Sequence, residues 1–170
     1  MSAIDNPFLN ALKILADAGV EFVVVGVGGI NFYARDPGGV VLTQDLDLLL
    51  APRVENLRTA LVALGGVGFG FSARGEPFVD LDDLAVLANI VRNAATLTAA
   101  NPAGAQLDLM LSASGFRYEE WAADAETFRL GEVELRVGRL EKLLRSKELS
   151  ARPKDVEFLR LYAARLRTPS

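Results

Sequence analysis

Residues 45–50 read Asp-Leu-Asp-Leu-Leu-Leu, and this run predicts a strand that begins with two acids. Side chains two positions apart in a strand share a face, so Asp45 and Asp47 are expected to point the same way. Two carboxylates so placed repel each other unless a cation lies between them. A hard divalent ion such as Mg²⁺ takes oxygen ligands of this kind. The alternative interpretation is an exposed strand start that carries two solvated acids.

The stretch before this strand predicts a second strand and a glycine-rich bend. Residues 20–25, apart from Glu21, are apolar and mostly β-branched, which is typical of a buried strand. They lead into Gly26-Val27-Gly28-Gly29, after which residues 30–34 can start a short helix. Glycines at such a bend let the backbone approach a ligand, and the following helix start offers free N–H groups to phosphate. The alternative is a tight turn that binds nothing.

The rest of the chain alternates helical patterns with short strands. Helices are expected over residues 7–18, 54–64, 139–147 and 153–165, and hairpin strands over residues 95–99 with 105–111 and 128–130 with 132–137. Residues 36–39 are expected to form a turn, residues 66–75 a loop or an irregular strand, and residues 80–92 a helix or a strand. The pattern predicts an α/β (α+β) fold, with a mixed β-sheet flanked by helices and a C-terminal helical pair.

Composition narrows the chemistry. The chain has 170 residues, of which 51% are hydrophobic, so it can bury a core as a single domain over residues 1–170. It contains 0 His, and its Cys count is also 0. Catalytic triads built on histidine, thiolate nucleophiles and zinc sites with these ligands are therefore excluded. The remaining chemistry depends on carboxylates, cations and hydroxyls.

Charge divides the chain into two parts. Residues 1–135 carry 8 basic and 18 acidic side chains, whereas residues 136–170 carry 10 basic and 4 acidic ones. An acidic core followed by two basic helices is typical of a site where cations and phosphates meet, although a solvated helical tail has the same pattern. There is no signal-peptide pattern and no apolar stretch long enough to span a membrane, so a cytoplasmic protein without membrane contact is expected.

Asp108 and the tail add further candidates. Asp108 lies among apolar residues in 106–111, where a buried lone carboxylate is costly, so it either faces solvent or is a third ligand of the same metal. Lys154 falls in the first turn of the last expected helix, where a cation opposes the helix dipole. Asp155 lies near the third position, where a carboxylate holds a helix start. Lys147 either reaches phosphates or faces water.

These segments, in this order, resemble the nucleotidyltransferase-fold superfamily. Its pattern is a strand, a Gly-Gly pair, a short helix, an Asp-x-Asp strand and a third acid on a later strand. Residues 23–29, residues 43–48 and Asp108 match it in turn. Residues 147–155 look like the K-x4-R-x-K-D segment of the small bacterial stand-alone branch, which includes abortive-infection-type toxins. The chain departs from the pattern at Val41, where an Arg is common, and Arg35 is the candidate substitute.

The resemblance implies a nucleotidyltransferase-like fold and the transfer of an NMP group from an NTP to a hydroxyl. It implies Mg²⁺ or Mn²⁺ at Asp45, Asp47 and Asp108, which would be both catalytic and metal-binding. The nucleotide-binding residues that it implies are Gly28, Gly29, Thr43, Lys147, Arg152, Lys154 and Asp155. The acceptor stays open among RNA (transfer RNA included), a protein and a small molecule, and an antitoxin-type protein partner fits the branch.

Two other functions remain. The first is a non-catalytic module of the same fold that binds a nucleotide or another protein. The second is a dinucleotide-binding Rossmann unit, because Gly26-Val27-Gly28 begins its glycine motif and Asp45 lies near the expected acid. Against the second function, Asn31 occupies the third glycine position, and Asp45 opens its strand whereas a ribose-binding acid ends one.

Overall fold

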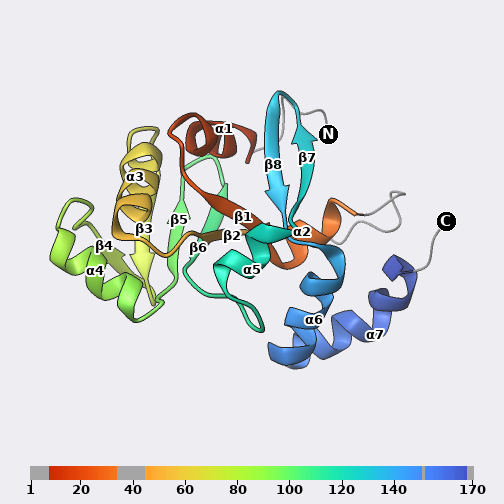
Figure 1. The fold of residues 1–170 in the computed structure, drawn as a ribbon. Coiled ribbons are helices and arrows are strands. Elements are labelled where there is room, and N and C mark those ends of the chain that lie inside the picture. Colours follow the sequence, from red (N-terminus) through yellow and green to blue (C-terminus); the bar gives the residue numbers. More distant parts are fainter. Residues whose placement is uncertain (1–7, 34–44, 151, 168–170) are drawn as a thin grey trace.

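A computed structural model describes residues 8–33, 45–150 and 152–167. Within these ranges the chain forms an eight-stranded mixed sheet of order β4-β3-β5-β6-β2-β1-β8-β7 and seven helices (Figure 1). The strands are β1 Phe22–Val25, β2 Asp45–Leu50, β3 Gly70–Ala73, β4 Glu76–Phe78, β5 Leu97–Ala100, β6 Gln106–Met110, β7 Glu126–Leu130 and β8 Val133–Val137. The helices are α1 Leu9–Asp17, α2 Gly26–Asn31, α3 Val54–Gly65, α4 Leu84–Arg92, α5 Tyr118–Ala123, α6 Leu140–Ser150 and α7 Pro153–Arg167.

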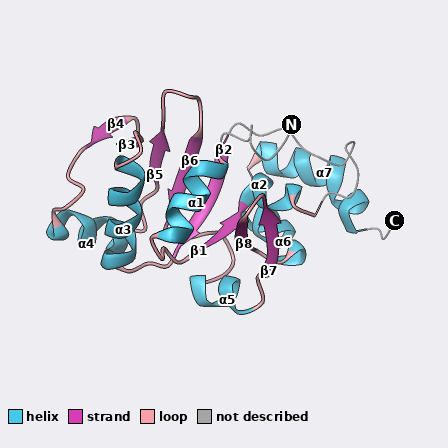
Figure 2. Cartoon of the chain, turned by 90° about the horizontal axis from the view of Figure 1, so that it is seen from above, coloured by secondary structure: helices cyan, strands magenta, loops and turns pink. Residues whose placement is uncertain are grey.

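Helices α3 and α4 lie at one end of the sheet, beside β3 and β4, and the α6–α7 pair lies at the other (Figures 1 and 2). Helix α1 packs on α3, and α3 packs on α4, while α6 contacts both α2 and α7. This arrangement confirms the expected mixed sheet flanked by helices and the C-terminal helical pair. None of the helices in the described part of the chain is long and apolar enough to cross a membrane.

The centre of the sheet is built from β1, β2 and β6. All four side chains of β1 are buried, as its β-branched run predicts. Strand β2 begins at Asp45 as expected, pairs antiparallel with β1 and pairs parallel with β6. Its leucines are buried, and its two acids are half-buried. The first residues of β2 therefore lie at the surface, while the rest of the strand lies in the apolar core.

Strands β5 and β6 form the hairpin that the sequence predicts. Asn101 fixes the turn, because its Oδ1 accepts a hydrogen bond from the Ala105 N–H at 2.9 Å. Gly104 adopts φ +94°, a conformation that L side chains rarely take. The turn sets the register of the pair and thereby places Thr98 opposite Asp108.

In four segments the observed secondary structure differs from the expected one or decides between two expected forms. Helix α2 begins at Gly26 and includes the glycines, so the expected bend with a helix from Ile30 onward is wrong in its position. Residues 66–75 contain the regular strand β3. The ambiguous stretch 80–92 contains helix α4, which Asp83 caps by accepting hydrogen bonds from the Ala85 and Val86 N–H groups. Helix α5 was not expected. The turn predicted at residues 36–39 lies outside the described residues.

The two edge strands of the described sheet carry a proline or charged side chains. Strand β4 has three residues, Glu76, Pro77 and Phe78, and pairs only with β3. Strand β7 forms the other edge and carries exposed Glu126 and Arg129. The expected second hairpin, β7 with β8, is confirmed.

Candidate active site

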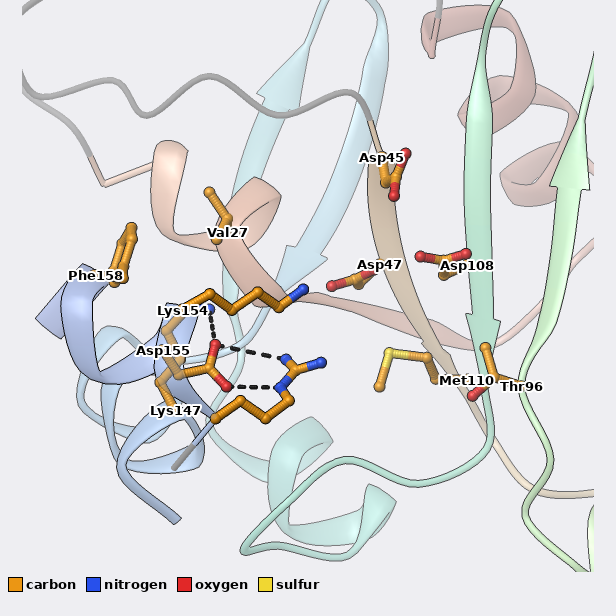
Figure 3. Close-up of a pocket in the computed structure, with 11 residues that line it drawn as sticks. Val27, Asp45, Asp47, Thr96, Asp108, Met110, Lys147, Lys154, Asp155 and Phe158 are labelled. Carbon is orange, nitrogen blue, oxygen red and sulfur yellow. Dashed lines mark hydrogen bonds and ion pairs between the residues drawn. The ribbon is translucent and has the colours of Figure 1, made fainter. Parts of the chain in front are cut away.

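A cavity of about 410 Å³ opens where the first residues of β2 face the α6–α7 pair (Figure 3). One side of it carries the carboxylates of Asp45, Asp47 and Asp108. The opposite side carries three cations, Lys147, Arg152 and Lys154. The cavity therefore has one acidic wall and one basic wall.

The sheet register brings the three aspartates together. Asp47 lies directly opposite Asp108 in the parallel β2–β6 pair, and Asp45 lies two residues before Asp47. Paired residues on neighbouring strands share a face, as do residues two apart on one strand. All three carboxylates therefore line the same cavity, as Figure 3 shows. The expectation that Asp108 lies on the same side of the sheet as the other two acids is confirmed.

Burial and mutual repulsion alter the acidity of two of these groups. Burial, the charge of Asp108 and a hydrogen bond with Asp108 raise the pKa of Asp47 to about 6, against the opposing charge of Lys147. Burial and the charge of Asp108 also raise the pKa of Asp45, and Lys154 opposes this rise. Asp47, beside Asp108, therefore holds a proton more tightly than an ordinary aspartate does.

The glycine-rich turn touches the site through residues other than those expected. Gly28 and Gly29 are buried inside α2, where a Cβ at Gly28 would lie 2.5 Å from Leu46 Cδ1. Val27 lines the main cavity. Gly26 lines a smaller adjoining cavity of about 90 Å³ that shares Asp47 with the first. Gly28 therefore serves the packing of α2 on β2, and Gly29 its packing against Val24 of β1 and Leu143 of α6.

The basic wall is anchored by a buried carboxylate. Asp155 is 1% exposed and accepts hydrogen bonds from Lys147 Nζ at 3.1 Å, Arg152 Nε at 2.8 Å and Ser150 Oγ at 2.6 Å (Figure 3). Burial opposes the ionisation of this group, but these hydrogen bonds outweigh it and hold the pKa of Asp155 well below its usual range. These contacts hold two cations of the basic wall, Lys147 and Arg152, in place.

The three cations are held differently. Lys147 is 11% exposed at its side chain, and its Nζ lies 4.9 Å from the centre of the Phe158 ring. Arg152 is 60% exposed while it pairs with Asp155. The Lys154 side chain extends into the cavity toward the aspartates (Figure 3), and its charge acts on Asp45. Lys147 is thus fixed against its neighbours, while Lys154 reaches across the cavity.

Several lining residues have no counterpart in the sequence analysis. Thr96 and Met110 line one part of the cavity, and Val27 with Phe158 lines another (Figure 3). Thr98 lies behind Asp108, and its Oγ1 donates a hydrogen bond to Asp108 Oδ1 at 3.2 Å. The alternation along residues 95–99 identifies Thr96 and Thr98 as sharing a face, but only the hairpin register places that face beside Asp108. The candidate Thr43, together with Val41 and Arg35, lies outside the described residues.

The donor set suits one class of ion. Three carboxylates without nitrogen or sulfur donors match a hard cation such as Mg²⁺. As the side chains stand, no group of three or more acidic residues in the described ranges is arranged closely enough to hold a metal ion. The chemistry of the donors therefore fits Mg²⁺, while binding would require the three carboxylates to move closer together.

Comparison of the chain with protein-family models and with curated proteins finds no match. The functional argument therefore depends on the residues of the cavity.

Proposed function

We propose that the chain is a nucleotidyltransferase, with a nucleotidyltransferase-like fold, that moves an NMP group from an NTP to a hydroxyl of an acceptor. The observation that carries the proposal is the cavity itself, in which Asp45, Asp47 and Asp108 face three basic side chains. Triphosphates need cations around their oxygens, and the acceptor hydroxyl needs a group that takes its proton. The two walls of the cavity supply both.

In the proposed reaction, the acceptor oxygen forms a bond to the α-phosphorus. The bond from that phosphorus to the bridging oxygen of the β-phosphate breaks, and pyrophosphate leaves with the electron pair. Lys147, Arg152 and Lys154 offset the charge of the triphosphate and of the leaving pyrophosphate. Asp108 accepts the proton of the acceptor hydroxyl, since it lies on the strand beyond Asp47 from the basic wall.

A divalent ion fits this scheme through the carboxylates. Asp45, Asp47 and Asp108 are the residues that would hold Mg²⁺ or Mn²⁺, which would neutralise phosphate charge and lower the pKa of the acceptor hydroxyl. The ion pairs of the buried Asp155 carboxylate hold Lys147 and Arg152 in the lining of the cavity. The acceptor is unassigned among RNA, protein and small molecules.

The proposal is tested by an Asp47→Asn variant, which keeps the shape of the side chain and removes its charge. Pyrophosphate release from each NTP with Mg²⁺ or Mn²⁺, in the presence of cell extract as the source of acceptor, should fall at least about 100-fold. The matched control is Asp82→Asn, because Asp82 pairs with Arg58 on the exposed surface and does not line the cavity. Its activity should equal that of the wild type.

Labelled NTP identifies the acceptor in the same experiment, because the label is transferred to it. Wild-type protein that binds an NTP, yet releases no pyrophosphate with any extract or metal, would identify a non-catalytic binding module instead. Wild-type protein that neither binds nor turns over any NTP would exclude both functions.

A further inference from the structure

Four polar side chains form a row across four neighbouring strands. Ser72 on β3 is paired with Thr98 on β5, Thr98 is paired with Asp108 on β6, and Asp108 is paired with Asp47 on β2. Directly paired residues point to the same face of a sheet, so all four side chains lie on the face that carries the cavity. Asp47 lies at the end of the row nearest the basic wall, Asp108 follows it, and the neutral residues Thr98 and Ser72 lie farther away.

Thr98 is the member of this row that binds an aspartate from behind. Its Oγ1 donates a hydrogen bond to Asp108 Oδ1 at 3.2 Å, from the strand on the side of β6 away from Asp47. Threonine is stiff about χ1, and its strand is held in register by the hairpin turn, so the donor has a defined position. Asp108 is therefore held between Thr98 on one side and Asp47 on the other.

We propose that Thr98 is a positioning residue, whose hydroxyl fixes the rotation of the Asp108 carboxylate and presents its other oxygen, Oδ2, to the cavity. Thr98 does not line the cavity, so it acts through Asp108 and not on the nucleotide. A carboxylate with one oxygen already engaged loses less rotational freedom when a cation or an acceptor hydroxyl binds the other. The catalytic consequence of this arrangement depends on the proposed function, whereas the orientation of Asp108 does not.

The test compares variants that remove or keep the hydroxyl. Thr98→Val has the same shape without the donor, and Thr98→Ser keeps the donor with a smaller side chain. Thr98→Ala makes the same test if valine does not fit. Ser72→Ala is the matched control, because it removes a hydroxyl from the same row one strand farther from Asp108. Each protein is examined by crystallography without metal, by titration with Mn²⁺ alone, and by NTP turnover.

In the Thr98→Val crystal structure, the Asp108 carboxylate should rotate by more than about 30° from its wild-type orientation, because its χ2 torsion has a broad range of accessible angles once no donor holds it. Mn²⁺ affinity and kcat should each fall about tenfold, the loss expected for one hydrogen bond, while the KM for NTP stays within about twofold. Thr98→Ser should restore all three properties, and Ser72→Ala should leave them unchanged.

An Asp108 carboxylate that keeps its orientation in Thr98→Val overturns this inference, and so does an unchanged Mn²⁺ affinity. A wild-type protein without NTP turnover would overturn the proposed function alone, because the crystal structures still decide the role of Thr98. An equal fall in Mn²⁺ affinity and kcat in Ser72→Ala would also count against it, since the effect would then belong to the whole row.

Discussion

Gly26 shows how a residue without a side chain shapes the acidic wall. It follows β1 directly, adopts φ +68° and lies against Asp47. A Cβ at this position would lie 2.2 Å from Asp47 Oδ2, so any larger residue displaces the carboxylate. The glycine thus allows the chain to turn from β1 into α2 and leaves room for the acid in the same place.

We expect Gly26→Ala to reduce NTP turnover at least about tenfold, because the new methyl group moves Asp47 out of the cavity. The positive φ adds a conformational cost of about 1–2 kcal/mol. Gly75→Ala is the matched control, since Gly75 has φ +82° and nothing within 4 Å of its would-be Cβ. Urea denaturation should show a loss of stability in both variants, larger in Gly26→Ala because the methyl group also displaces Asp47, and steady-state assays should show the activity loss in Gly26→Ala alone. Equal activities would mean that Asp47 tolerates displacement.

At the scale of elements, the junction of α6 and α7 is held by ion pairs around one buried group. Asp155 at the start of α7 binds Lys147 in α6 and Arg152 just before α7. Removing one partner of a buried pair leaves the other charge without compensation. The same contacts position two cations of the basic wall, so stability and site geometry are coupled at this junction.

We expect Asp155→Ala to lower the free energy of unfolding at pH 7 by about 3 kcal/mol, because Lys147 remains buried without its counter-ion. Urea denaturation measures the change. Asp17→Ala, which removes an exposed partner of Lys13, should cost no more than about 0.5 kcal/mol.

The pH dependence of this difference has a defined sign. The pKa of Asp155 in the folded protein lies well below its usual range, so the stabilisation is present above about pH 4, the ordinary value for Asp. It is lost as the pH falls through the folded-state pKa. The stability of the wild type should therefore approach that of Asp155→Ala as the pH is lowered from 4 to the acid limit of the assay. A difference that stays constant over this range would place the effect of the variant elsewhere.

At the scale of the whole molecule, Trp121 lies where the sheet meets the C-terminal helices. It is the only tryptophan of the chain and is fully buried in α5, packed edge-to-face on Phe116. A Cβ at Gly138, just before α6, would lie 2.7 Å from its ring. The indole is thus in close contact with the segment that joins residues 1–135 to the basic helices.

We expect urea denaturation followed by Trp121 fluorescence to coincide with denaturation followed by far-ultraviolet circular dichroism. One cooperative unit that includes both the sheet and the helices unfolds in a single step, with the same midpoint by both signals. A fluorescence midpoint at lower urea would show that the α5–α6 region separates first, and residues 1–170 would then not unfold as one domain.

The local pattern of the sequence predicts much of the fold, and non-local pairing determines the rest. Strand β2 and the shared face of Asp45 and Asp47 follow from alternation along the chain. Convergence of Asp108 on them depends on β6 lying beside β2, a pairing between segments about 60 residues apart that periodicity does not encode. The family resemblance supplied that expectation.

Two of the local differences between the expected and the observed elements have physical causes. Glycine has a low helix propensity, so residues 26–29 were expected to form a bend, but close packing of α2 on Leu46 requires the missing side chain. Gly70 and Pro77 are of types depleted in strands, so β3 and β4 were not expected as a regular pair. Pairing of β3 with β5 overrides that preference. The supporting role of Thr98 also depends on register and so could not be deduced from spacing alone.

The short outer strand β4 has a consequence for self-association. Pro77 has no N–H group to donate to the backbone of an incoming strand. The strand β4 also has only three residues with which an incoming strand could pair. The opposite margin, β7, presents charged side chains that disfavour the approach of another copy. Both margins of the described sheet therefore disfavour pairing with another copy, so concentrated solutions of the folded protein should resist amyloid seeding.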